Sequence, residues 1–239
     1  MQKKPPAKNA RTIHTMFSAV AHRYDVANTI LSGGVHYIWR RQIVRWSGAR
    51  KGQRVLDCAT GTGDLAIVYK KAVGKSGEAI ATDYCEPMIE KGPQKAARHG
   101  VAIDFEVADA MKLPYKAGSF DITSMAFGIR NVADAHVALK QMGRVTKAGG
   151  KVMILEFGQP SQPIVNAAYS LYAQKILPII GGLITGQPKA YRYLQSSSKT
   201  FPCGEDFTKF MMKSGMFSQV EYRRLSFGIA YMYKAIVKK

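Results

Sequence analysis

An alternation of short apolar runs with helical patterns between residues 54 and 157 constrains the fold most strongly. Apolar runs that end in turn residues predict buried strands, whereas spacings of three and four predict helices. Strands are predicted at 54–58, 78–82, 101–107, 120–126 and 151–157, with helices at 64–73, at 86–99 and in a segment ending at Val145. Gly149 and Gly150 are predicted to stop the last of these helices. Strands that alternate with helices predict a parallel sheet with helices on both of its faces.

The C-terminal segment breaks this alternation. Phe217–Leu225 and Ile229–Val237 form two strand patterns, separated by a short turn around Phe227 and Gly228. No helix fits between them, so the two strands should pair antiparallel. The predicted fold class is therefore α/β, with a mostly parallel seven-stranded sheet that ends in an antiparallel hairpin.

The remaining chain divides into an N-terminal part and an apolar segment. We predict a basic tail and helical lid in residues 1–50 and the α/β domain in residues 51–239. Between Phe157 and Pro188 the only charged residue is Lys175. This segment fits a buried helix with a proline kink, and equally a greasy lid or a membrane-facing patch. No run of about 18 apolar residues predicts a spanning helix.

Charge is concentrated at the two ends of the chain. The formal net charge is +19, and residues 1–50 contribute +8, residues 51–188 contribute +4 and residues 189–239 contribute +7. Basic ends fit nucleic acid, anionic lipid or a solvated basic face. Cys58, Cys85 and Cys203 lack the spacing of a zinc site or a disulfide framework, so no metal is predicted.

A glycine-rich loop follows the first predicted strand. Gly61-x-Gly63-x-x-Ala66 opens a helix, and an acid follows about twenty residues later, as in dinucleotide-binding sites. However, Asp57 and Asp64 flank the loop and would oppose a pyrophosphate. They suit a ligand with a cationic amino group, and S-adenosylmethionine is such a ligand.

Further acids follow the second and third predicted strands. Asp83 can accept both ribose hydroxyls, and Asp109 with Ala110 can meet the adenine edge. Gly61 and Gly63 allow the backbone to approach the ligand closely. Since ligands of open α/β sheets bind at the carboxyl ends of the strands, we expect these groups to converge on one cofactor site.

Four separated segments carry a resemblance to a known family. They read YDVANTILSGGVHYIW at 24–39, FGIRNV at 127–132, RVTKAGGKVMILEFG at 144–158 and YRYL at 191–194. The chain resembles the ubiquinone/menaquinone biosynthesis C-methyltransferases, a group of class I S-adenosylmethionine-dependent methyltransferases with a Rossmann-like fold. The resemblance extends from about Thr15 to Lys238.

The resemblance implies a reaction and a set of cofactor contacts. The reaction is transfer of a methyl group from S-adenosylmethionine to a ring carbon of a demethylated polyprenyl quinol. The product would be menaquinol, a methylated 2-polyprenyl-6-methoxy-1,4-benzoquinol, or both. The implied cofactor contacts fall on Thr62, Asp83, Asp109 and Ala110.

Methylation of a ring carbon requires a quinol hydroxyl to lose its proton, so the site needs a base and groups that stabilise the quinolate. Arg130 and Asn131 follow the fourth predicted strand, where Arg130 can stabilise the quinolate and Asn131 can hold a ring oxygen. His36 and Tyr24, in the helical lid, are candidates for a proton acceptor or relay.

A polyprenyl tail partitions into lipid, so the enzyme is expected to meet its substrate at a membrane. The segment 160–200 would cover the substrate, and the basic ends would rest on anionic lipid. The expected location is cytoplasmic, peripherally associated with the inner face of the membrane.

Two other functions fit parts of the sequence. The charge suits an RNA methyltransferase on the same fold, but no Asn/Asp-Pro-Pro-aromatic motif follows the fourth predicted strand. Phe201-Pro202-Cys203 is similar to the Pro-Cys pair of a methyltransferase that attacks cytosine. It lies beyond the fifth predicted strand, however, and fits a turn with a buried thiol. A non-catalytic binding protein would not need the full set of acids. We therefore expect no nucleic acid partner.

Overall fold

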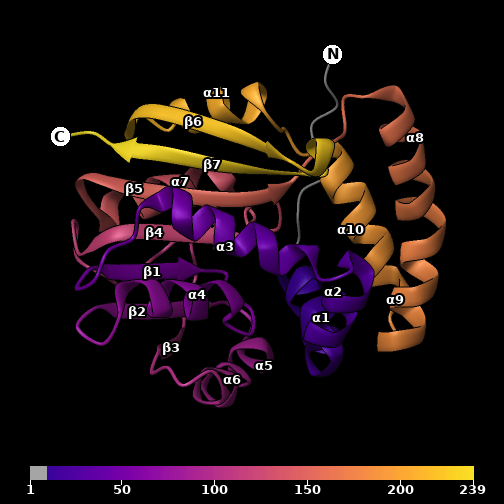
Figure 1. Cartoon of the computed structure of the whole chain (residues 1–239), viewed down its shortest axis with the longest axis horizontal. Helices are drawn as coiled ribbons and strands as arrows, with labels where there is room; N and C mark the ends of the chain where they lie inside the picture. Colours follow the sequence, from indigo (N-terminus) through magenta and orange to yellow (C-terminus); the bar gives the residue numbers. More distant parts are fainter. Residues whose placement is uncertain (1–9) are drawn as a thin grey trace.

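The centre of the computed structural model, which describes residues 10–239, is one mixed sheet (Figure 1). Its strands are β1 (Arg54–Cys58), β2 (Glu78–Asp83), β3 (Asp104–Val107), β4 (Phe120–Ala126), β5 (Thr146–Phe157), β6 (Phe217–Leu225) and β7 (Ala230–Val237). The strand order is β3-β2-β1-β4-β5-β7-β6. Strands β1 to β5 pair in parallel, whereas β7 is antiparallel to both β5 and β6. The predicted fold class is confirmed.

Helices surround this sheet and continue beyond one of its ends. They are α1 (Ala10–Val20), α2 (Tyr24–Ser32), α3 (Val35–Ser47), α4 (Asp64–Val73), α5 (Glu86–Ile89), α6 (Gly92–Arg98), α7 (Ala135–Val145), α8 (Pro163–Leu171), α9 (Leu177–Thr185), α10 (Pro188–Thr200) and α11 (Glu205–Met212). Three short turns of helix are η1 (Ala21–Arg23), η2 (Tyr172–Ile176) and η3 (Ser226–Gly228). Helices α1, α2, α8, α9 and α10 gather beyond one end of the sheet (Figure 1).

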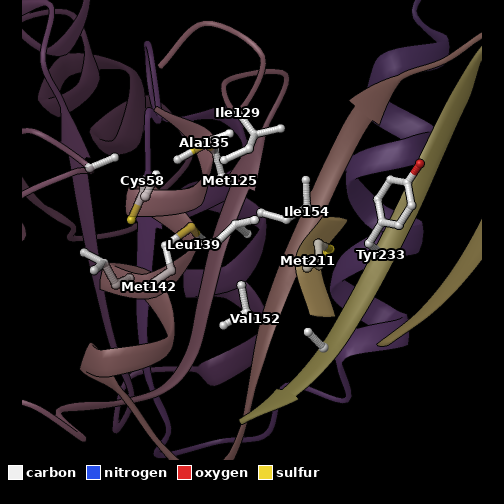
Figure 2. Packing of buried hydrophobic residues seen from close by; sticks show 14 of the residues in the cluster. Cys58, Met125, Ile129, Ala135, Leu139, Met142, Val152, Ile154, Met211 and Tyr233 are labelled. Atoms are coloured by element: carbon white, nitrogen blue, oxygen red, sulfur yellow. The ribbon is translucent and has the colours of Figure 1, made fainter. Parts of the chain in front are cut away.

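The two faces of the sheet carry separate apolar clusters. Successive residues of a strand point to opposite faces, and β5 follows this rule. Val152 and Ile154 pack with α7 and α11, as Figure 2 shows around Leu139 and Met211. Met153 and Leu155 pack on the other face, in the cluster that contains residues of α3 and α4. Burial on both faces explains why the central strands read as continuous apolar runs.

Three predicted elements differ from the structure. The helix predicted at 86–99 is two helices, because Pro93 has no N–H to donate to the carbonyl of Ile89. Strand β3 is shorter than predicted. Strand β5 is longer and begins at Thr146, so Gly149 and Gly150 lie inside the strand instead of ending helix α7.

The apolar segment forms one run of helix from α8 through η2 to α9. The run passes through a π-helical turn at η2, just before Pro178, which cannot donate a regular helical hydrogen bond. No spanning helix was predicted, but by length and composition alone Pro163–Thr185 qualifies as a helix able to cross a membrane, with a mean hydropathy of 1.2 over 18 residues. Only 22% of this 18-residue stretch is buried, so the helix does not belong to the protein core.

Packing between distant segments builds a helical cover over the end of the sheet. Ala27 of α2, Leu177 of α9 and Tyr191 of α10 form a small buried cluster. Gly181 lies so close to Tyr191 that a Cβ there would be 2.5 Å from the ring. Helices predicted as an N-terminal lid and as a cover thus pack on each other. The domain boundaries stay a prediction, and the predicted tail at residues 1–9 lies outside the described residues.

Candidate cofactor and substrate site

The glycine loop connects β1 to α4 through three residues with positive φ, which are Ala59, Gly61 and Gly63. Gly61 has φ 61° and Gly63 has φ 89°, values that favour glycine. The Gly61 N–H donates to Asp83 Oδ2 at 2.7 Å, which joins the loop to the end of β2. A Cβ on Gly63 would lie 2.8 Å from the Phe105 ring. Protein packing therefore requires this glycine, in addition to any approach by a ligand.

Asp57 lies on β1 with its side chain buried beneath the loop. Its carboxylate accepts hydrogen bonds from Thr60 Oγ1 and Ser124 Oγ, each at 2.7 Å. Burial raises the pKa of Asp57 to about 6, although both hydroxyl hydrogen bonds oppose this shift. A cationic ligand group beside Asp57 would favour the ionised carboxylate.

Asp83 is the last residue of β2, and Asp109 follows the neighbouring strand β3. Asp83 accepts the N–H groups of Gly61 and Cys85, and burial still raises its pKa. Each carboxylate oxygen has two lone pairs, so Asp83 retains acceptor capacity for hydroxyl groups. Asp109 accepts the Met111 N–H at 2.8 Å, and Ala110 beside it is buried. The predicted groups therefore lie at the carboxyl ends of neighbouring strands.

A polar network ties the glycine loop to the helical cover. Thr62 Oγ1 donates to Asp25 Oδ1 of α2 at 2.6 Å. Lys95 Nζ contacts Asp25 at 2.8 Å and Asp64 at 2.5 Å, and Arg40 lies 3.4 Å from Asp64. Burial alone would raise the pKa of Asp64, but the two cations outweigh it and lower that pKa. Asp64, predicted to favour a cationic ligand, is instead paired with protein cations.

Two cavities meet at this network. A small cavity of about 20 Å³ lies at the glycine loop, and its lining includes Asp57, Gly61 and Thr62. A larger cavity of about 500 Å³ lies among α1, α2, α3, α8, α9 and α10. Tyr24 and Arg40 line both cavities. The larger lining is mostly apolar and aromatic, with Trp39, Phe157 and Tyr169 among its residues.

The sequence matches one protein family along nearly its whole length. The description of that family is the ubiE/COQ5 methyltransferase family, and the match covers residues 4–237. A ubiquinone/menaquinone biosynthesis C-methyltransferase UbiE from Bdellovibrio bacteriovorus is 54% identical over 230 residues, covering 96% of this chain and 97% of the relative. The chain belongs to the ubiE/COQ5 methyltransferase family. A protein of the same name from Pseudomonas putida is 38% identical, covering 98% of this chain and 92% of the relative.

Solved structures show the same fold. A methyltransferase from Thermotoga maritima, described as a possible histamine N-methyltransferase, has a TM-score of 0.66 at 21% identity, covering 95% of this chain and all of that one. The [4+2]-cyclase SpnF has a TM-score of 0.64 at 14% identity, with 98% of each chain covered. Proteins described as a methyltransferase and as a cyclase share this fold, so the fold alone does not define the reaction. The assignment of the reaction therefore rests on the family.

This family member is a methyltransferase that uses S-adenosylmethionine. Its residues fit that cofactor. Acids lie at three adjacent strand ends, and Arg40 Nε, beside the glycine loop, is a buried donor without a hydrogen-bond partner among the described residues. Asp83 would hold the ribose, and Asp57 would face the ammonium group. Among residues 10–239 no group of His, Cys, Asp and Glu gathers in a way that could hold a metal ion.

Arg130 lines the larger cavity of the methyltransferase and forms a buried ion pair. Its Nη1 lies 2.5 Å from Glu156 Oε1 and donates to the Phe127 carbonyl at 2.8 Å. The Arg130 guanidinium also lies over the Phe157 ring, 5.2 Å from its centroid. Its position at the cavity fits the predicted role, and its charge is partly offset by Glu156.

His36 and Tyr24 line the same cavity, but neither side chain is suited to accept a proton. Arg40 Nη1 contacts His36 Nδ1, and burial with the Arg40 charge lowers the pKa of His36 to about 4. Because arginine donates, His36 is neutral with its proton on Nε2. Burial raises the pKa of the Tyr24 phenol, which stays protonated. Their geometry favours hydrogen-bond donors over the predicted proton acceptors.

Asn131 is not among the residues that line the cavity. Its amide donates to the Phe127 carbonyl at 3.2 Å, and its carbonyl oxygen accepts from the Tyr193 hydroxyl at 3.3 Å. Tyr193 does line the cavity. These hydrogen bonds engage both ends of the Asn131 amide, and its contact with a ring oxygen stays a prediction.

Sequence reasoning missed several functional candidates. Arg40 and Lys95 lie outside the quoted motifs, and Glu156 lies inside one without a predicted role, although each pairs with a residue of the site. Asp25 could have been noticed from the sequence, because it is the only acid in residues 1–50. Its partners Thr62 and Lys95 are 37 and 70 residues away, so spacing could not reveal them.

Proposed function

We propose that this enzyme methylates a ring carbon of a demethylated polyprenyl quinol, either demethylmenaquinol or 2-polyprenyl-6-methoxy-1,4-benzoquinol. The observation that carries the proposal is the cavity of about 500 Å³, which is mostly apolar and reaches the glycine loop at Tyr24 and Arg40. Pockets of this volume hold ligands of about drug size. A quinol ring with its first isoprene units fits such a site. The names of the relatives support the same substrate class.

The polar groups of the cavity suit a quinolate. S-adenosylmethionine supplies an electrophilic methyl group when bound. Arg130, Tyr24 and His36 all line the cavity, and each can donate a hydrogen bond to a negatively charged ring oxygen. Donors fixed in a site with little water stabilise developing charge strongly. We propose that Arg130 stabilises the quinolate, with Tyr24 and His36 as additional donors.

A methyl-transfer assay tests the substrate. The protein is incubated with methyl-labelled S-adenosylmethionine and either a demethylated polyprenyl quinol or bulk RNA. We expect label in the quinol and none in RNA. The oxidised quinone is the matched control, because it has no hydroxyl proton to lose and should receive no label. Label in RNA without label in the quinol would reject the proposed function.

We also propose that the outer face of the α8–α9 run rests on the cytoplasmic face of a membrane. One face of this run lines the cavity through Ala168, Tyr172 and Leu177. The opposite face exposes Ile179 at 63% and Leu183 at 79% to solvent, with Ile164 at 86%. Because one face is committed to the cavity, the helix would lie along the lipid surface instead of crossing it. In Figure 1 α8 and α9 form the outer edge of the cover.

Exposed basic side chains lie within and shortly after the apolar run. Lys175 lies within the apolar run, and Lys189 and Arg192 follow it on α10, all exposed. Each basic residue near an anionic surface contributes about 1 kcal/mol of attraction. The tail of the substrate would then pass from the bilayer into the cavity beneath the same helices.

Replacing Ile179 and Leu183 together with Ser is expected to weaken binding to anionic vesicles by about 10-fold or more. Full burial of each side chain stabilises by roughly 1.5–3 kcal/mol, and partial insertion realises part of that. Vesicle co-sedimentation at several salt concentrations measures the effect. Val137→Ser, on α7, is the control and should bind like the wild type. Absence of wild-type binding at low salt would contradict the proposal.

A further inference from the structure

The small cavity at the glycine loop has an unequal distribution of charge. Its described lining residues include two acids, Asp57 and Asp64, and a single cation, Arg40. Arg40 comes from α3, in the helical cover, and only 6% of its surface is exposed. No motif of the sequence and no role in the proposed reaction accounts for a buried arginine here.

The hydrogen bonds of Arg40 leave part of its guanidinium available. Nη1 contacts His36, and Nη2 lies 3.4 Å from Asp64, which is long for a charge-assisted hydrogen bond. Asp64 has a shorter ion pair with Lys95, at 2.5 Å. The Nε–H group of Arg40 is buried and has no hydrogen-bond partner among the described residues. A buried donor without a partner is unfavourable, so this group is suited to an anionic acceptor.

The amino-acid end of S-adenosylmethionine carries an ammonium group and a carboxylate. The cavity offers one partner for each charge, since Asp57 is a buried acid and Arg40 is a buried cation in the same lining. A guanidinium binds a carboxylate through two parallel N–H groups, and Nε with one Nη forms such a pair.

We propose that Arg40 binds the α-carboxylate of S-adenosylmethionine. The proposal rests on the cofactor assigned above and goes beyond it, because it names the group that recognises the anionic end of the ligand. Ion pairing of Asp64 with Lys95 leaves Arg40 free to exchange its long contact with Asp64 for the ligand. Since Arg40 belongs to the cover, cofactor binding would also fix α3 above the substrate cavity.

Comparison of two ligands on the wild-type protein is the first test. Isothermal titration without a methyl acceptor measures the affinity for S-adenosylmethionine and for its decarboxylated analogue. Hydrogen bonds to charged groups predict about 10- to 100-fold tighter binding of S-adenosylmethionine. Equal affinities would overturn the Arg40 assignment alone. No binding of either ligand would overturn the cofactor and the proposal together.

Substitution of Arg40 is the second test. Arg40→Met should lower the affinity for S-adenosylmethionine by about 10- to 100-fold and that for the decarboxylated analogue by less than about 3-fold. Arg40→Lys keeps the positive charge but lacks the two parallel N–H groups of the guanidinium, so it should give an intermediate affinity. Arg41→Met, at the exposed neighbouring position, should change neither. Equal losses for both ligands, or no loss for S-adenosylmethionine, would overturn the proposal. If Arg40→Met does not fold, the wild-type comparison and Arg40→Lys still decide.

Discussion

Replacing Asp83 with Ala is expected to weaken S-adenosylmethionine binding by about 100-fold or more. Hydrogen bonds to a charged group are worth about 1.5–3 kcal/mol each, and Asp83 would accept both ribose hydroxyls. Two such bonds correspond to a loss of at least two orders of magnitude in affinity. Isothermal titration with S-adenosylmethionine measures the loss directly.

The same substitution affects the protein itself, so the experiment needs two comparisons. Asp83 accepts the N–H groups of Gly61 and Cys85, which Ala would leave without this acceptor. Asp83→Asn retains one acceptor oxygen and separates loss of charge from loss of the loop contact. Asp104→Ala, at the exposed start of β3, should bind S-adenosylmethionine like the wild type. Unchanged affinity in Asp83→Ala would refute the ribose assignment.

Replacing Arg130 with Met is expected to destabilise the protein by about 3–5 kcal/mol. Arg130 and Glu156 are only 3% and 1% exposed, and removal of one partner leaves an uncompensated buried charge. For a chain of this size the melting temperature should fall by roughly 10 °C. Thermal unfolding followed by circular dichroism measures the change. Lys209→Met breaks an exposed ion pair with Glu205 and should leave the midpoint nearly unchanged.

A double substitution separates the structural role of Arg130 from its proposed catalytic role. Arg130→Met with Glu156→Gln removes both charges, and it should recover a large part of the stability lost in the single variant. The folded double variant should still have a kcat about 100-fold lower, as loss of one stabilising donor predicts. Wild-type kcat in the double variant would show that Arg130 only supports the fold.

The chain order of strands and helices was predictable because it depends on local periodicity. Buried parallel strands read as apolar runs, and their carboxyl ends share one edge of the sheet. Asp57, Asp83 and Asp109 lie at or just beyond the carboxyl ends of three such strands, so the order of elements alone predicted the position of the cofactor site. Element ends were less predictable, as Gly149 and Gly150 show, because strand pairing extends β5 beyond its apolar core.

Side-chain partners were not predictable from the sequence. Arg130 pairs with Glu156 only because β4 and β5 are neighbours, and Asp25 reaches Thr62 only because α2 packs over the glycine loop. His36 was a candidate proton acceptor by residue type, but the contact with Arg40 and burial make it a neutral donor.

The sequence by itself determined the fold class, the edge of the sheet that binds the cofactor and the family. The tertiary structure alone decided which charges are compensated, which protons are held and where the apolar cavity lies. The physical reason is that backbone periodicity is a local property. Burial and ion pairing instead depend on which distant segments pack together, because electrostatic interactions strengthen as water is excluded.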